Sequence, residues 1–335
     1  MIDLFKVIEQ EKSILKIVTK TKNEVFFIEK WITHHLNILQ DTRLIIFDNM
    51  SDDDYVRSIY GKYRDRIILV KFNGYMDCLH MANKFLPLYK SLSISSKFFT
   101  IIDSDEYLYF YDNDNGKVVK DSLVIKFLED NLDCNFFVPC WIENIADNEK
   151  LLSFNPNNFS LFNWSKPIIN TKLIQTFESA LTKYECPILH HTYQLPISTY
   201  GKAPTKFLLL HLKNLNKYQR IKTNMQKLVA LNIINNDKDF SALLKINPND
   251  INHGRGYIIE TIKLIEKILH YNDQHTDKQG TIELYDDGTL KFTPNSYEKD
   301  FIDLMNSDYF ELINFDPNKI DINQFTSIES CKHLL

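Results

Sequence analysis

Glycine and proline are scarce in this sequence, with 8 glycines and 10 prolines among 335 residues. This composition excludes a collagen-like repeat and a linker-like chain. The sequence also contains neither Gly-x-Gly-x-x-Gly nor Gly-x-x-x-x-Gly-Lys-Ser/Thr, and its one Gly-x-Gly, at 254–256, follows no predicted strand. Without a glycine-rich cradle of backbone amides, a bound phosphate must be neutralised by a metal ion together with lysine or arginine.

Cysteine is also rare, and no two cysteines are spaced Cys-x-x-Cys. This absence excludes a zinc ribbon and a thioredoxin-like redox motif. An odd, scattered set of cysteines predicts a reducing compartment. The five are Cys78, Cys134, Cys140, Cys186 and Cys331.

Long apolar runs and an excess of basic charge are both absent. No run approaches the roughly 18 residues of a membrane-spanning helix, and Asp3, Lys6 and Glu9 interrupt the N-terminal apolar stretch, unlike a signal-peptide core. The 39 basic and 44 acidic side chains give a net charge of −5, so no global field draws the protein to nucleic acid. We expect a soluble, cytoplasmic protein, and this expectation is compatible with peripheral contact at the inner face of a membrane.

Residues 14–110 alternate short runs of β-branched or aromatic residues with longer helical patterns, which is typical of parallel βαβ units in an α/β fold. Helical patterns lie between the first two runs, near 52–60, and over about 76–89. A further strand is predicted over 135–141. The four early runs are 14–19, 43–47, 66–72 and 97–102.

Beyond about residue 211 the alternation of strand and helix patterns gives way to long helical patterns. Two long helical patterns cover roughly 217–231 and 257–271, and TIELYDDGTLKF (281–292) predicts a hairpin because Asp-Gly between alternating runs favours a tight turn. We therefore predict two domains: an α/β domain over 1–215 and a helical C-terminal extension over 216–335 that carries the small hairpin.

Polar segments follow three of the predicted strands. They are Thr19–Glu24, Asp48–Asp52 and Asp103–Glu106. Ligands of open α/β sheets bind beyond the carboxyl ends of the strands, so these segments are expected to meet. Converging carboxylates repel one another unless a cation lies among them, and carboxylate oxygens suit Mg²⁺ or Mn²⁺. Asp103-x-Asp105 alone is a weak signal, and the apolar strand that precedes it strengthens it.

Three consecutive segments match one family in order and spacing. KNEVFFIEKWITHHLNIL (22–39), RLIIFDNMSDDD (43–54) and FFTIIDSDEYL (98–108) resemble the family-2-like group of GT-A (Rossmann-like) glycosyltransferases. A weaker continuation includes KPIINTKLI (166–174), the pair at 190–191 and His211, so the resemblance covers about residues 14–227. The matching positions are Lys22, Glu24, Trp31, His35, Asp48, Asn49, Ser51, Asp52, Asp103, Asp105 and Glu106.

The sequence also departs from that group. Ile142-Glu143-Asn144 stands where the family has Phe-Gly after Trp141, and the glycine usual after the Trp–His helix is replaced around Leu39-Gln40. These departures concern the choice of acceptor more than donor binding.

The resemblance implies that domain 1–215 binds a nucleotide-sugar and a divalent ion, Mn²⁺ or Mg²⁺. Asp105 would ligate the metal that bridges the two phosphates, Asp103 would contact the ribose or the metal's water shell, and His211 would be a third ligand. Without the family, a lone histidine is more often a hydrogen-bonded structural residue. The resemblance assigns donor binding to Thr19, Lys22, Glu24, Asp48, Asp103, Lys166 and Lys222.

Inverting transfer needs a general base that takes the proton of the acceptor hydroxyl, and a carboxylate suits that task. Glu143 and Asp147 follow the predicted strand and are the catalytic candidates, although each also fits an ordinary exposed acid. The basic segment 213–227 fits either a diphosphate or anionic-acceptor site or a solvated helix face.

The favoured function is therefore a metal-dependent, inverting glycosyltransferase. It would move a sugar from a nucleotide donor, expected to be UDP-linked, to an oligosaccharide or glycolipid acceptor in bacterial capsule or lipooligosaccharide assembly. A haloacid-dehalogenase-like phosphatase would need Thr or Val at the position of Tyr107, and a nucleotidyltransferase would need a glycine-rich opening. A non-catalytic glycan- or nucleotide-binding module also remains open.

Overall fold

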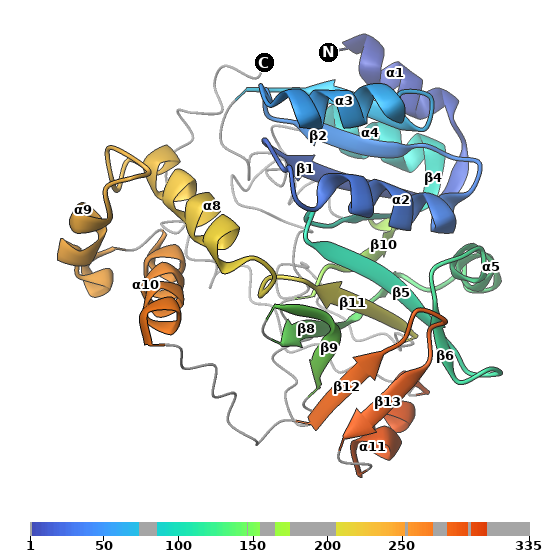
Figure 1. Cartoon of the computed structure of the whole chain (residues 1–335). Helices are drawn as coiled ribbons and strands as arrows, with labels where there is room; N and C mark the ends of the chain where they lie inside the picture. The colour runs from blue at the N-terminus through green and yellow to red at the C-terminus, as the bar shows by residue number, and fades with distance from the viewer. Residues whose placement is uncertain are drawn as a thin grey trace.

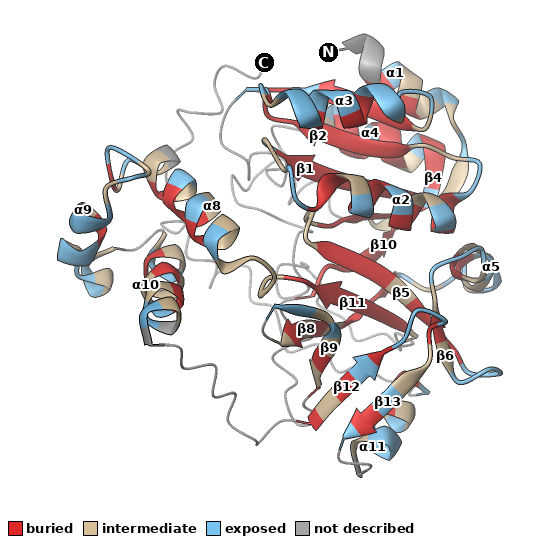
Figure 2. Cartoon of the chain, in the orientation of Figure 1, coloured by how far each residue is buried: buried red, intermediate tan, exposed pale blue. Residues whose placement is uncertain are grey.

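The computed structural model describes residues 2–73, 86–145, 147–154, 165–174, 206–251, 254–270, 280–293 and 296–306. These residues form two β-sheets with helices packed on them (Figure 1). Figure 2 shows that the buried residues are concentrated in the sheets. The predicted α/β class, a mostly parallel sheet flanked by helices, is confirmed.

Sheet A has six strands in the order β3-β2-β1-β4-β10-β7. The first four are parallel and correspond to the four predicted runs, whereas β10 and β7 are antiparallel to their neighbours. Helices cover this sheet, so its strands are apolar at successive positions rather than at alternate ones. The strands are β1 (Ser13–Thr21), β2 (Leu44–Asp48), β3 (Ile67–Lys71), β4 (Ser96–Ile101), β10 (Ile168–Asn170) and β7 (Phe136–Phe137).

Helices α2 and α3 match predicted helical patterns, whereas α1 and α5 were not predicted. Helix α2 buries Ile28, Trp31 and Ile32, and the side chain of Asp53 caps α3 by accepting from the backbone N–H groups of Tyr55 and Val56. Part of the helix predicted over 76–89 lies outside the described residues. The helices are α1 (Ile2–Gln10), α2 (Ile28–Leu39), α3 (Asp54–Lys62), α4 (Leu86–Ser95) and α5 (Leu123–Asp130).

Sheet B has seven strands in the order β13-β12-β9-β8-β11-β5-β6. The run predicted as one strand over 135–141 is divided: its first part forms β7 in sheet A, and its last two residues begin β8 in sheet B. The strands of sheet B are β5 (Glu106–Asp112), β6 (Lys117–Val119), β8 (Cys140–Ile145), β9 (Asn148–Phe154), β11 (Phe207–His211), β12 (Gly280–Leu284) and β13 (Leu290–Thr293).

Two histidines on α2 attach that helix to β5 of sheet B. The Nε2 of His34 donates to the carbonyl oxygen of Leu108 at 2.7 Å, and the backbone N–H of Leu108 donates to Nε2 of His35 at 3.3 Å. Both rings are buried, and Nδ1 of His35 donates to the carbonyl of Trp31. The pair thus fixes the strand that begins at Glu106.

The predicted C-terminal hairpin is confirmed as β12 and β13, and its turn packs on β6. Gly288 has φ +85°, and a Cβ at this position would lie 2.1 Å from the carbonyl oxygen of Val118. The backbone N–H of Val118 donates to the carbonyl of Gly288 at 2.9 Å. Only glycine fits this positive φ and close approach.

Helices α8, α9 and α10 form a second hydrophobic core, whereas Phe301 and Met305 of α11 belong to the core of the two sheets. Ile221, Met225 and Leu228 of α8 pack with Ile258 and Leu264 of α10, apart from the core of the two sheets. Within the described part of the chain, no helix combines the length and apolarity needed to cross a membrane. The elements are α8 (Lys217–Ala230), α9 (Phe240–Lys245), η3 (Pro248–Asp250), α10 (Arg255–His270) and α11 (Ser296–Met305). The division into two domains stays a prediction.

Candidate active site

The polar segments after β1 and β2 are joined by Asn23. Its backbone N–H donates to Oγ of Ser51 at 2.8 Å, and its side-chain oxygen accepts from the backbone N–H of Asp52 at 2.9 Å. Thr19 precedes this junction; its Oγ1 is buried and has no hydrogen-bond partner among the described residues. The two strand ends therefore form one connected surface, as predicted.

Asp48 lies inside this junction. It is 1% exposed, and Oδ2 accepts from the backbone N–H of Ser51 at 3.0 Å. Its Oδ1 accepts from the hydroxyls of Ser51 and, at 3.2 Å, Tyr60. The structure thus gives Asp48 a role in holding its own loop, and its predicted contact with a nucleoside stays a prediction.

A second group of acids follows β4, and buried Lys166 lies among them. Nζ of Lys166 is 2.7 Å from Oδ2 of Asp103 and 3.6 Å from Oε1 of Glu106. Glu106 also accepts from the backbone N–H of Asp103 at 2.9 Å. Burial raises the pKa of Glu106 to about 7, and the charge of Lys166 opposes that rise.

Asp105 is held by two groups that come from distant parts of the chain. Its Oδ2 lies 3.2 Å from Nε2 of His211, at the end of β11, and 3.2 Å from Nη1 of Arg220, on α8. Burial on its own would raise the pKa of Asp105, but His211 and Arg220 outweigh burial and lower it. Asp105 is therefore a carboxylate at neutral pH.

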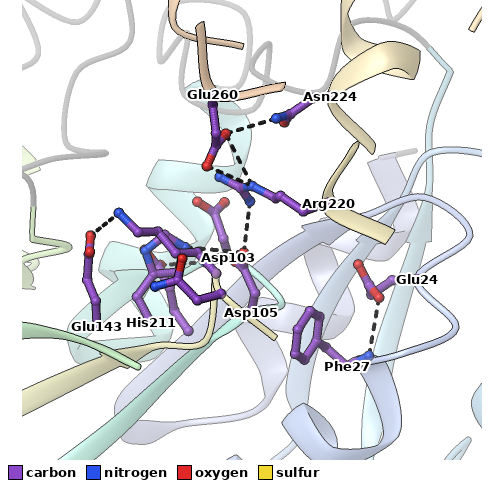
Figure 3. A network of polar contacts seen from close by, with 12 residues as sticks. Glu24, Phe27, Asp103, Asp105, Glu143, His211, Arg220, Asn224 and Glu260 are labelled. Carbon is purple, nitrogen blue, oxygen red and sulfur yellow. Dashed lines mark hydrogen bonds and ion pairs between the residues drawn. The ribbon is translucent and has the colours of Figure 1, made fainter. Parts of the chain in front are cut away.

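Arg220 continues this network into the helical extension (Figure 3). Its Nε is 3.2 Å and 3.3 Å from the two carboxylate oxygens of Glu260, on α10. We define the strand-end cluster as the residues that these contacts connect or bring beside them. They are Asp103, Asp105, Glu106, Lys166, His211, Arg220 and Glu260.

Glu143 borders the strand-end cluster. It pairs in register with His211 across β8 and β11, and it forms an ion pair with Lys213. The Trp141 ring stacks on His211, with centroids 5.0 Å apart and planes at 17°. Figure 3 shows Glu143 on the side of His211 away from Arg220.

The other predicted site residues lie in the loop before α2, in the turn between β8 and β9, and on α8. Glu24 accepts from the backbone N–H groups of Phe26 and Phe27, which lie just before α2; its pKa is raised by burial first and by nearby Asp105 as well. Lys22 and Lys222 are exposed. Asp147 accepts from the backbone N–H of Asn216 and so holds the start of α8. Of the two predicted general bases, Glu143 is the one that lies beside His211. The pair at 190–191 lies outside the described residues.

Neither Arg220 nor Glu260 was among the site residues predicted from the sequence. Arg220 was one member of a basic segment, and Glu260 lies beyond the region of resemblance. A usable signal was present: Arg220 and Asn224 are four residues apart and flank the apolar positions Ile221, Met225 and Leu228. Polar residues at the border of an apolar helical stripe indicate a buried polar contact.

The cluster contains four carboxyl groups but only two permanently charged cations, Lys166 and Arg220. Burial is the main cause of the raised pKa of Glu106, and the nearby charge of Asp103 adds to it. Among the described residues, no group of three or more His, Cys, Asp or Glu side chains is arranged to hold a metal ion. Asp103 faces Lys166, so Asp105 and His211 are the two donors that face each other.

No protein-family model and no curated protein sequence matches this chain significantly. Among solved structures, the chain is similar to residues 1–349 of S. aureus TarS in complex with UDP, at 14% identity and a TM-score of 0.36 over 90% of this chain and 100% of that chain. A mannosyltransferase, PcManGT from Pyrobaculum calidifontis, in complex with GDP-Man and Mn²⁺, matches at 11% identity and a TM-score of 0.35 over 78% and 76%. The 4-diphosphocytidyl-2C-methyl-D-erythritol synthase of Anaerococcus prevotii matches at 15% identity and a TM-score of 0.30 over 54% and 80%. These TM-scores are too low to indicate a function, so the proposal below depends on the residues of the site.

Proposed function

We propose that this protein is a glycosyltransferase that uses a nucleotide-sugar donor and a divalent cation. One observation carries the proposal: Asp105, at the carboxyl edge of the parallel sheet, is shared by His211 and Arg220, which return from distant segments. That edge is where open α/β sheets bind ligands. The motif resemblance over residues 22–108 supports the same family of reactions.

The side chains at Asp105 fit a divalent ion. Oδ2 of Asp105 and Nε2 of His211 are 3.2 Å apart, close enough for one ion to contact both atoms. Mg²⁺ is often held by one or two protein ligands and completed by substrate phosphates. Asp105 and His211 would hold the ion, and when bound it would stabilise charge on the departing diphosphate. Mn²⁺ or Mg²⁺ suits these donors.

The cations of the cluster would act on the donor itself. With a net charge of −5 the chain offers no general attraction for a diphosphate, so the attraction must be local. Arg220 and Lys166 supply permanent positive charge at the strand ends. Thr19, Lys22, Glu24, Asp48, Asp103 and Lys222 complete the proposed donor-binding set, on the resemblance.

For the acceptor, we propose Glu143 as the general base. It lies in register with His211 at the edge of the strand-end cluster, and its carboxylate forms an ion pair with Lys213. Asp147 is the weaker candidate because it is engaged at the start of α8. The resemblance supports inverting transfer from a UDP-linked sugar to a saccharide or glycolipid in capsule or lipooligosaccharide assembly.

Nucleotide release tests the proposal. The purified chain is incubated with Mn²⁺ and a panel of nucleotide-sugars and saccharide acceptors, and nucleoside diphosphate is measured. We expect turnover with at least one donor and a loss of about 100-fold or more in Asp105→Ala. Asp114→Ala, an exposed acid in the turn after β5, is the matched control and should keep wild-type turnover.

Other outcomes would redirect the assignment. Equal turnover in wild type and Asp105→Ala would overturn the metal assignment. Binding of uridine diphosphate without turnover of any donor would favour a binding module, and turnover of nitrophenyl phosphate would favour the phosphatase.

A further inference from the structure

Arg220 is shared between two carboxylates that belong to different parts of the molecule. Its Nη1 contacts Asp105 at the edge of the sheet, and its Nε contacts both oxygens of Glu260 on α10. The Arg220 side chain is 18% exposed and the Glu260 side chain 30% exposed. The contact between them is therefore largely withdrawn from water and stronger than a surface ion pair.

The position of Glu260 is itself fixed by two features. Nδ2 of Asn224, a fully buried residue one turn after Arg220 on α8, donates to Oε2 of Glu260 at 2.9 Å. The core between α8 and α10 holds the two helices together through Ile221, Met225 and Ile258. Arg220 thus meets a preformed acceptor on α10 before any ligand is present.

Sharing Arg220 changes the charge available at Asp105. A guanidinium that served Asp105 alone would be its full counter-ion and would compete with a divalent cation for the carboxylate. Because Glu260 takes the Nε side of the guanidinium, Asp105 keeps part of its negative charge. The same contact directs Nη1 toward the strand end, where the diphosphate is proposed to bind.

We propose that Glu260 is a positioning residue: it holds Arg220 so that Asp105 retains its affinity for a divalent cation and Arg220 faces the diphosphate. This inference rests on the proposed function. It makes the helical extension, beyond the region of resemblance, part of the donor site. It also separates Glu260 from residues that touch the donor, because Glu260 acts only through Arg220.

The experiment measures the affinity of the full chain for uridine diphosphate in excess Mn²⁺ by titration calorimetry. Glu260→Gln keeps the shape of the side chain and the hydrogen-bonding capacity toward Asn224, and we expect it to raise Kd about tenfold or more, in the range of residues that orient a ligand. Glu266→Gln, an exposed acid on the same helix, should leave Kd unchanged.

A double-mutant cycle distinguishes positioning from a structural role. If Glu260 acts through Arg220, Glu260→Gln should change Kd by less than about twofold in the Arg220→Gln background. Equal losses in both backgrounds, or an unchanged Kd in the single variant, would overturn the inference. Absence of binding in the wild type would instead overturn the proposed function on which it rests. Far-ultraviolet circular dichroism shows which variants fold, and Arg220→Lys replaces Arg220→Gln in the cycle if the latter does not.

Discussion

Two strand ends of sheet A carry aspartates whose partners come from different distances along the chain. After β2, the oxygens of Asp48 accept hydrogen bonds from Ser51 and Tyr60, which lie 3 and 12 residues away in the chain. After β4, Asp103 and Asp105 contact Lys166 and His211, which lie 63 and 106 residues away. The first end is bonded to its own loop, whereas the second gathers cations from distant segments.

The difference shows at which end distant segments bring cations to the carboxylates. Hydrogen bonds from a local loop satisfy Asp48 within the fold, and the result is a rigid corner. Even with cations from separate segments, the β4 end has more carboxyl groups than permanent positive charges. Burial first, and the charges of Asp103 and Asp105 after it, raise the pKa of Glu106. A buried site with surplus negative charge favours a bound cation.

Removing Lys166 should give the largest effect on stability. In Lys166→Met, Asp103 and Glu106 lose their buried cation, and breaking a buried ion pair costs about 3–5 kcal/mol. The side chains of Lys166 and Glu106 are 1% and 2% exposed, so water has little access to the carboxylate of Glu106, whereas Asp103 is 34% exposed. Urea unfolding measures the change in the free energy of unfolding.

Lys172→Met is the control for Lys166→Met. Lys172 is 62% exposed and lies 3.6 Å from an exposed carboxylate, so its loss should change stability by about 0.5 kcal/mol or less. A loss below about 1 kcal/mol in Lys166→Met would show that the acids after β4 do not depend on a distant cation.

A smaller loss is expected at the locally bonded strand end. Asp48→Ala leaves the backbone N–H of Ser51 and the hydroxyl of Tyr60 without their acceptor, which costs about 2–3 kcal/mol. Asp65→Ala, 87% exposed, should be nearly neutral in the same urea titration. A loss below about 1 kcal/mol in Asp48→Ala would show that the hydrogen bonds from Ser51 and Tyr60 do not stabilise this strand end.

Much of the fold could be predicted because its signals are local. The runs that became β1 to β4 are apolar at successive positions, and α2 repeats its apolar residues at helical spacing. The division of residues 135–141 between two sheets had one local signal: Pro139 has no backbone N–H to donate within a continuous strand, and β7 and β8 end and begin on either side of it. Which sheet a residue joins depends on partners that lie far away in the sequence.

Some residues of the candidate site could likewise be predicted from the sequence, and others could not. Asp103, Asp105, Lys166 and His211 were predicted through a family pattern, and the structure brings them together. Their individual roles stay predictions. Glu260 could not be found from the sequence, because only the packing of α10 on α8 places it beside Arg220. For Asp48 the sequence allowed two interpretations. Ser51 lies three residues later, at the spacing of a hydrogen bond within a loop, and this competes with ligand binding by Asp48.

The third and smallest expected effect is the loss of stability at acid pH. It should come from the two histidines of α2 that hold β5, and not from the strand-end cluster. Burial lowers the pKa of His35 to about 3, and burial together with the neighbouring His35 lowers the pKa of His34. The unfolded histidine takes up a proton near pH 6.5, so between about pH 6.5 and 3 the unfolded state binds more protons and the free energy of unfolding falls as pH falls. At pH 5.5 the wild type should lose about 1.4 kcal/mol more than His35→Gln, relative to pH 7.5. Thr33→Gln, on the exposed face of α2, is the control and should keep the wild-type dependence of the free energy of unfolding on pH. If His35→Gln also kept that dependence, acid would act on the strand-end cluster and not on the histidine contacts with β5.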